Sequence, residues 1–126
     1  MEKYINIPYS LHGRDFDGCD CWGLVRLIYK HHLGIELPSY SENYISLQES
    51  EEIKCLFDKE KSLIWTEVND PKKYDCVVLR TTSVHIGVVL ENNYFIHILE
   101  NTNSTIERIN SPLWKNRIMG YYRYGK

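Results

Sequence analysis

The stretch "DCWGLVRLIYKHHLG", residues 20–34, predicts a helix near the N-terminus. Its apolar side chains recur at helical spacing, at Leu24, Leu27 and Ile28. Asp20 is a favourable N-cap residue, and Gly34 stands where a left-handed residue commonly ends a helix. We therefore expect a helix of about three turns that begins at Cys21.

From residue 63 onward the sequence changes to short β-rich runs separated by turn residues. The runs are "LIWTEV" (63–68), "DCVVLR" (75–80), "HIGVVL" (85–90), "YFIHIL" (94–99), "TIERI" (105–109) and "IMGYYRY" (118–124). A second helix is expected around residues 49–62, where Ile53, Leu56 and Phe57 form an apolar face. Helices followed by strands indicate an α+β fold, in which the N-terminal helix packs on an antiparallel sheet of about five to six strands.

The composition describes one ordinary globular domain. Of 126 residues, 43% are hydrophobic and 25% are charged, so we expect a single domain over residues 1–126. A net charge of −2 and scattered basic residues argue against nucleic acid as a partner. No run approaches the roughly 18 apolar residues of a membrane span, and the first residues lack the pattern of a signal peptide. We therefore expect synthesis in the cytoplasm without a signal peptide, and no membrane partner.

The cysteines raise the question of a reactive thiol. All four are expected to be free thiols, because disulfides are rare in the cytoplasm: Cys19, Cys21, Cys55 and Cys76. A helix N-terminus stabilises a thiolate through its unsatisfied backbone N–H groups and its positive dipole end. Cys21 lies in the first turn of the predicted helix, whereas Cys19 lies before the cap. Cys21 is therefore the favoured nucleophile.

A thiol nucleophile needs a base, and the base needs a group that orients it. His85 and His97 lie in two neighbouring β-rich runs. A three-residue loop, 91–93, would pair Gly87 with His97 and place both histidines on one sheet face. A two-residue loop at Asn92 and Asn93 would send them to opposite faces. The catalytic interpretation of His85 and His97 requires the three-residue loop. The alternative interpretation is that both are ordinary histidines of a half-buried sheet.

A metal-binding module is the first rival interpretation. It would use Cys19 and Cys21 with the adjacent pair His31 and His32. This C-x-C and H-H pattern lacks the paired C-x2-C spacing of zinc sites, and the intervening helix would separate the pairs by about 15 Å. We therefore expect no metal and no cofactor.

Several short motifs follow one another along the chain. They are "IPYSLHGRDFDGCDC" (7–21), "DCWG" (20–23), "YDCVVLR" (74–80), "HIG" (85–87) and "FIHI" (95–98). In this order and at these spacings they resemble the NlpC-type cell-wall cysteine peptidases of bacteria and their phages. That family combines a D-C-S-G-type helix start, an H-[IV]-G strand start and a polar residue in the next strand. The resemblance implies a papain-like α+β fold.

The resemblance also assigns catalytic roles. It implies that Cys21 is the nucleophile, His85 the general base and His97 the group that orients His85. Tyr9 matches the family's tyrosine near the nucleophile, whose hydroxyl would join the backbone N–H of Cys21 as an oxyanion donor.

Two further positions bear on substrate recognition. Asp20 matches an aspartate that binds a substrate amine in some family members, although an N-cap role needs only its position. Trp22 stands where many members carry serine. The string "DCWGL" (20–24) resembles the small single-domain hydrolases of phage tails.

The implied activity is hydrolysis of an amide in peptidoglycan stem peptides, typically between γ-D-glutamate and the diamino acid, through a thioester. The expected substrate is peptidoglycan or a muropeptide, and phage tail proteins are expected partners if the protein acts at the wall from a virion. The alternatives are another thiol enzyme on the same scaffold, such as an acyltransferase, deamidase or amidase, or a catalytically idle tail-assembly subunit.

Overall fold

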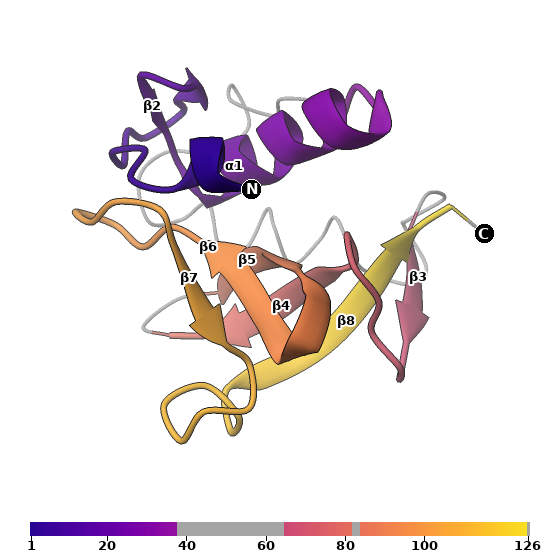
Figure 1. The fold of residues 1–126 in the computed structure, drawn as a ribbon. Helices are drawn as coiled ribbons and strands as arrows, with labels where there is room; N and C mark the ends of the chain where they lie inside the picture. The colour runs from indigo at the N-terminus through magenta and orange to yellow at the C-terminus, as the bar shows by residue number, and fades with distance from the viewer. Residues whose placement is uncertain (38–64, 82–83, 126) are drawn as a thin grey trace.

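The computed structural model describes residues 1–37, 65–81 and 84–125 (Figure 1). One helical segment lies across a sheet that the C-terminal part of the chain forms. The second helix predicted around residues 49–62 and Cys55 lie outside the described residues.

The predicted N-terminal helix begins and ends where expected. Helix α1 spans Cys21–Ile28 and continues into a π-helical turn, η2 (Tyr29–Leu33). The Asp20 side chain caps the start by accepting a hydrogen bond of 2.8 Å from the backbone N–H of Gly23. Gly34 ends the segment with φ 67°, in the left-handed region that suits glycine. The N-cap and the C-terminal glycine are thus confirmed, whereas the π-helical turn was not predicted.

All six β-rich runs form strands of one sheet. They are β3 (Trp65–Val68), β4 (Cys76–Arg80), β5 (Val84–Val89), β6 (Tyr94–His97), β7 (Thr105–Arg108) and β8 (Ile118–Tyr124). The spatial order is β3-β8-β4-β5-β6-β7, and every pair is antiparallel. The predicted α+β, papain-like arrangement of a helix on an antiparallel sheet is therefore confirmed. The sequence did not predict that β8 lies between β3 and β4.

The loop between β5 and β6 has the length on which the catalytic reading depends. Residues 91–93 form a short 3₁₀ turn, with Asn92 and Asn93 at φ 59° and 65°. Beside the loop, the backbone N–H of Leu90 donates to the carbonyl of Tyr94 at 2.8 Å. Val88 pairs with Ile96 and Val89 with Phe95, which is the predicted register.

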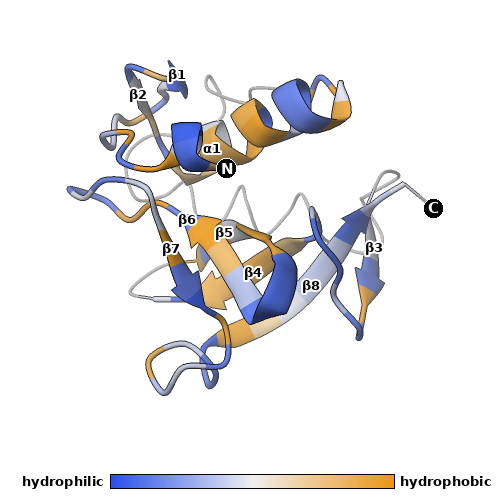
Figure 2. Cartoon of the chain, in the orientation of Figure 1, coloured by the Kyte–Doolittle hydropathy of each residue, from blue (hydrophilic) through white to orange (hydrophobic). Residues whose placement is uncertain are grey.

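The two faces of the sheet carry different residues. The main core lies between α1 and the sheet, and the strands contribute Cys76, Val78, Ile86, Val88 and Ile96 to it. A second cluster on the opposite face contains Val77, Leu79, Val89, Phe95, Ile109 and Trp114. Figure 2 shows apolar residues concentrated along α1 and along the central strands beside it. The period-2 alternation of the strands produces both clusters.

The N-terminal arm positions the start of the helix. It contains η1 (Glu2–Tyr4) and a small hairpin of β1 (Arg14–Asp15) and β2 (Gly18–Cys19). A Cβ placed at Gly23 would lie 2.2 Å from the carbonyl oxygen of Gly13, so a glycine is needed for this close approach.

Within the described ranges, no helix is both long and apolar enough to cross a bilayer.

Candidate active site

Cys21 is the first residue of α1 and is 4% exposed. The helix packs against β5, the strand that carries His85. The unsatisfied N–H groups and the positive dipole end of a helix favour an anionic sulfur at such a position. The element that carries the predicted nucleophile therefore contacts the element that carries the predicted base.

A chain of hydrogen bonds links three side chains on β5, β6 and β7. Nε2 of His85 lies 2.8 Å from Nδ1 of His97, and Nε2 of His97 lies 2.6 Å from Oε2 of Glu107. His85 and His97 are 5% and 1% exposed, whereas the Glu107 side chain is 33% exposed. The two histidines therefore lie on one sheet face and contact each other, as the three-residue loop required.

Aromatic side chains enclose His97, the middle residue of this hydrogen-bond chain. The His97 ring stacks on Phe95, with centroids 4.4 Å apart, and meets the edge of Trp114 at 5.1 Å.

Burial lowers the pKa of His85 to about 3, and repulsion from His97 adds to the effect. Burial also lowers the pKa of His97, although Glu107 opposes this change. Both rings are therefore neutral near pH 7, so each has one protonated and one unprotonated nitrogen.

Asp20 holds together the loop that precedes the nucleophile. Besides capping Gly23, its carboxylate accepts hydrogen bonds from the backbone N–H of His12 at 2.9 Å and from Nη1 of Arg14 at 2.7 Å. Asp20 is fully buried, and a buried carboxylate is stable only with such partners. The N-cap role is confirmed, while the predicted contact with a substrate amine stays a prediction.

The other two predicted substrate-side residues occupy different environments. Trp22 is 1% exposed and belongs to the main core, so packing is the role that the structure shows for it. Tyr9 is half-buried and forms a parallel β-bridge with Cys19. That bridge places Tyr9 beside the residue two positions before Cys21. The roles of Tyr9 in the oxyanion hole and of Trp22 in recognition stay predictions.

The other described cysteines have environments that suppress ionisation. Burial, aided by the charge of Asp20, raises the pKa of Cys19 to about 12. Burial likewise raises the pKa of Cys76 to about 12, although the Tyr29 hydroxyl opposes the shift. Both thiols are fully buried and stay protonated at neutral pH. Neither Cys19 nor Cys76 therefore supplies a thiolate at neutral pH.

The residues of the rival metal-site interpretation lie in separate environments. His31 and His32 lie in η2, at the other end of the helical segment from Cys21. Nδ1 of His32 lies 3.1 Å from the Tyr74 hydroxyl, and the His31 ring packs on Phe16 at 5.4 Å. Among the residues that the structure describes, no group of three or more His, Cys, Asp or Glu side chains has the geometry of a metal site.

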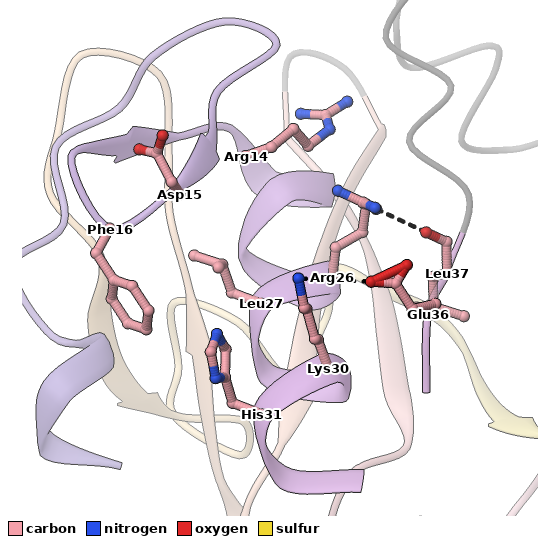
Figure 3. A pocket seen from close by; sticks show the side chains of 9 residues that line it. All are labelled: Arg14, Asp15, Phe16, Arg26, Leu27, Lys30, His31, Glu36 and Leu37. Atoms are coloured by element: carbon pink, nitrogen blue, oxygen red, sulfur yellow. Dashed lines mark hydrogen bonds and ion pairs between the residues drawn. The ribbon is translucent and has the colours of Figure 1, made fainter. Parts of the chain in front are cut away.

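A pocket lies beside α1, between the helix and the β1–β2 hairpin (Figure 3). Its lining residues are Arg14, Asp15, Phe16, Arg26, Leu27, Lys30, His31, Glu36 and Leu37. Several of its charges have partners: Nε of Arg26 donates to the Leu37 carbonyl, and Lys30 pairs with Glu36. The lining includes none of the predicted catalytic residues, so this pocket is separate from the histidine pair.

Sequence reasoning missed Glu107. The run "TIERI" was predicted to be a strand, but its neighbour in the sheet and the register between them were not. In the structure Phe95 pairs with Glu107 and His97 with Thr105, so Glu107 is the diagonal neighbour of His97. The available signal was a carboxylate in a strand next to the one that holds His97.

The sequence comparisons identify related proteins. Residues 6–123 match the NlpC/P60 family. The murein DD-endopeptidase MepS/murein LD-carboxypeptidase of Escherichia coli is 29% identical over 122 residues, which cover 93% of this chain and 57% of that protein. The gamma-DL-glutamyl hydrolase of Bacillus subtilis is 27% identical over 124 residues, covering 98% of this chain and 27% of that protein. This chain therefore spans little more than half the length of the first of these relatives.

Solved structures share the fold. A crystal structure of an NlpC/P60 family protein from Bacillus cereus matches with a TM-score of 0.68 at 22% identity, over 98% of this chain and 37% of that one. The NlpC/p60 domain of the peptidoglycan hydrolase SagA matches with a TM-score of 0.64 at 18% identity, over 97% of this chain and 91% of that domain.

Proposed function

This chain belongs to the NlpC/P60 family, and on that premise we propose that it is a cysteine peptidase that hydrolyses an amide bond in peptidoglycan stem peptides. The observation that carries the proposal is the buried hydrogen bond between His85 and His97, beside the helix that Cys21 begins. A thiol at a helix start, a histidine base and a second histidine bonded to that base form the set that acyl transfer requires.

The proposed reaction begins with transfer of the Cys21 thiol proton to Nδ1 of neutral His85. The sulfur then bonds to the carbonyl carbon, and the oxyanion accepts hydrogen bonds from the backbone N–H of Cys21 and the Tyr9 hydroxyl. Collapse of this intermediate breaks the C–N bond while His85 returns the proton to the leaving amine. Water, activated by His85, then hydrolyses the thioester and frees Cys21.

Cys21 and His85 each lie at the start of the element that carries them, and this supports the proposal that the two side chains meet. Cys21 is the first residue of α1, and His85 is the second residue of β5, with only Val84 before it in the strand. The side chain of His85 lies on the face of β5 opposite the one that α1 packs on, so the two groups can meet only beyond the start of the strand. We propose that the thiol and Nδ1 of His85 face the same carbonyl there, where the first residues of α1 and β5 lie.

We propose the bond between γ-D-glutamate and the diamino acid as the scissile bond. The name of the Bacillus subtilis relative, gamma-DL-glutamyl hydrolase, supports cleavage at a glutamyl amide. The name of the Escherichia coli relative specifies a DD-endopeptidase and an LD-carboxypeptidase, which are activities on other bonds.

Digestion of purified peptidoglycan tests the proposal. We expect soluble fragments whose masses correspond to one cleaved stem-peptide bond. Cys21→Ala should release none, whereas the matched variant Cys19→Ala should release the same fragments. No release by a folded protein with a reactive Cys21 thiol would instead favour an acyltransferase, a deamidase or amidase with another substrate, or an idle assembly subunit.

We also propose that the protein acts at the bacterial cell wall as part of a phage tail. The support is the string "DCWGL" (20–24), which resembles the hydrolases of phage tails. Antibodies against this chain should then detect it in purified virions at a fixed ratio to a tail protein. Its presence only in lysate would contradict tail association and leave the hydrolase proposal intact.

A further inference from the structure

The hydrogen-bond chain on β5, β6 and β7 determines where its protons lie. A carboxylate oxygen of Glu107 only accepts hydrogen bonds, so the 2.6 Å contact requires a proton on Nε2 of His97. A neutral imidazole carries one proton, so Nδ1 of His97 is left as an acceptor. The 2.8 Å contact with that Nδ1 then requires a proton on Nε2 of His85. These donor and acceptor assignments leave Nδ1 of neutral His85 unprotonated.

We propose that Glu107 is a positioning residue that fixes the tautomers of both histidines and thereby leaves Nδ1 of His85 available for the thiol proton. The inference deepens the proposed function and rests on it, because the thiol proton matters only if Cys21 is the nucleophile. Glu107 acts through His97 and His85, and it touches neither the thiol nor the substrate in this assignment.

The surroundings of His97 leave Glu107 as the group that selects the tautomer of its ring. His97 is 1% exposed and lies against Phe95 and Trp114, so bulk water is excluded from its ring. Within the described part of the chain, the two His97 nitrogens have Glu107 and His85 as their hydrogen-bond partners. Without the carboxylate, the His97 proton is free to move to Nδ1, and the same reasoning then places the His85 proton on Nδ1.

Glu107 is held in place by the sheet rather than by a flexible loop. It lies in the middle of β7, directly opposite Phe95, the residue that stacks on His97. Its side chain is 33% exposed, so it connects the buried rings with solvent. A partly hydrated carboxylate keeps its charge at low cost, which suits a fixed acceptor at the outer end of the chain.

Long-range ¹H–¹⁵N spectra of the histidine rings test the proton positions. The probe is the full chain carrying Cys21→Ala, so that no thiol proton is exchanged with His85. At pH 7 we expect a proton on Nε2 of both rings. Adding Glu107→Leu should produce mixed tautomers of His97 and His85, and Glu107→Gln should give an intermediate pattern, because its amide oxygen still accepts while its amide nitrogen competes.

Kinetics of the proteins with Cys21 intact complete the test. Glu107→Leu should lower kcat roughly tenfold to a hundredfold with little change in KM, with partial recovery in Glu107→Gln. Glu100→Gln, at an exposed site just after β6, is the matched control and should be unchanged. A proton on Nδ1 of His85 in the parent spectrum, or tautomers that Glu107→Leu leaves intact, would overturn the assignment.

The spectra separate this inference from the proposed function. If the parent shows the expected tautomers, and they change in Glu107→Leu, but peptidoglycan stays intact, Glu107 retains its role and the substrate proposal fails. If Glu107→Leu does not fold, Glu107→Gln supplies the comparison, and an unshifted tautomer pattern together with an unchanged kcat in that variant would then overturn the role.

Discussion

The two faces of β5 and β6 have different roles: one packs against α1, and the other carries the candidate site. On the face toward α1, Ile86, Val88 and Ile96 are fully buried in the main core. On the opposite face of the same strands, His85 and His97 form a hydrogen-bonded pair. Each histidine is adjacent in sequence to a core isoleucine, so one residue step changes the role of a side chain. The register of this hairpin therefore positions the core and the candidate site together.

The largest expected effect comes from replacing the two histidines, which share one face. His85→Ala should lower activity by about 10²- to 10⁴-fold, because it removes the proposed base, while the protein stays folded. His97→Ala should have a smaller effect, since a group that orients the base is more easily replaced. Both are measured as kcat/KM on peptidoglycan fragments, with circular dichroism as the folding control. Equal losses in the two variants would mean that the base and the orienting group are misassigned.

The packing face should respond in the opposite way. Ile86→Ala leaves a cavity between β5 and α1 and should lower the free energy of unfolding by about 2–5 kcal/mol. The fraction that remains folded should keep near-normal kcat, because the histidine pair lies on the other face. Urea unfolding and activity at low temperature measure the two effects. A large loss of kcat in fully folded Ile86→Ala would show that the faces are not independent.

Gly87 lies two residues after His85, on the histidine face of β5, and has little free space around it. A Cβ there would approach the Ile96 carbonyl oxygen to 2.9 Å and the His97 Cβ to 3.2 Å. Gly87→Ala should therefore cost about 1–3 kcal/mol of stability and displace His97, so that kcat falls as well. In the control, Gly120→Ala, the nearest atoms belong to the side chains of Tyr122 and Glu67 at 3.2–3.3 Å, and these can move. A Gly87→Ala protein with full activity would argue against strict positioning of His97.

The last test concerns acid stability, where the effect per pH unit is small. The pKa of His85 is lowered to about 3 by burial, whereas an unfolded histidine titrates near 6.5. Between these values the unfolded state binds more protons, so stability should fall as the pH falls from about 6.5 toward 3. One such group contributes at most about 1.4 kcal/mol per pH unit. Urea unfolding at several pH values should show a shallower slope in His85→Gln; an identical slope would contradict the neutral, buried state of His85.

The parts of this molecule that local patterns specify could be predicted from the sequence. Helical spacing with Asp20 and Gly34 specified the first helical segment, and period-2 runs specified the six strands. The sequence allowed a three-residue or a two-residue loop between β5 and β6, and the structure has the three-residue loop, which gives His85 and His97 a common face. These features depend on residues that are close in sequence, where turn and cap chemistry act.

The features that were missed depend on pairing between distant segments. Placing β8 between β3 and β4 requires a choice among several antiparallel partners, which alternation alone does not make. The Glu107 contact depends on the β6–β7 register across a connection from 98 to 104. The burial of the Trp22 indole in the core was also not predicted, because a motif comparison does not reveal packing.

The position of β8 has a consequence for how the chain acquires its structure. This strand is the last of the six in sequence, but it pairs on both sides, with β3 and with β4. During synthesis β3 and β4 therefore have unpaired edges until residues 118–124 emerge, and open edges are prone to pair with other chains. Long-range pairings of this kind also slow folding. A ribosome-bound chain that stops before Ile118 should thus remain protease-sensitive and depend on chaperones, although it already contains every proposed catalytic residue.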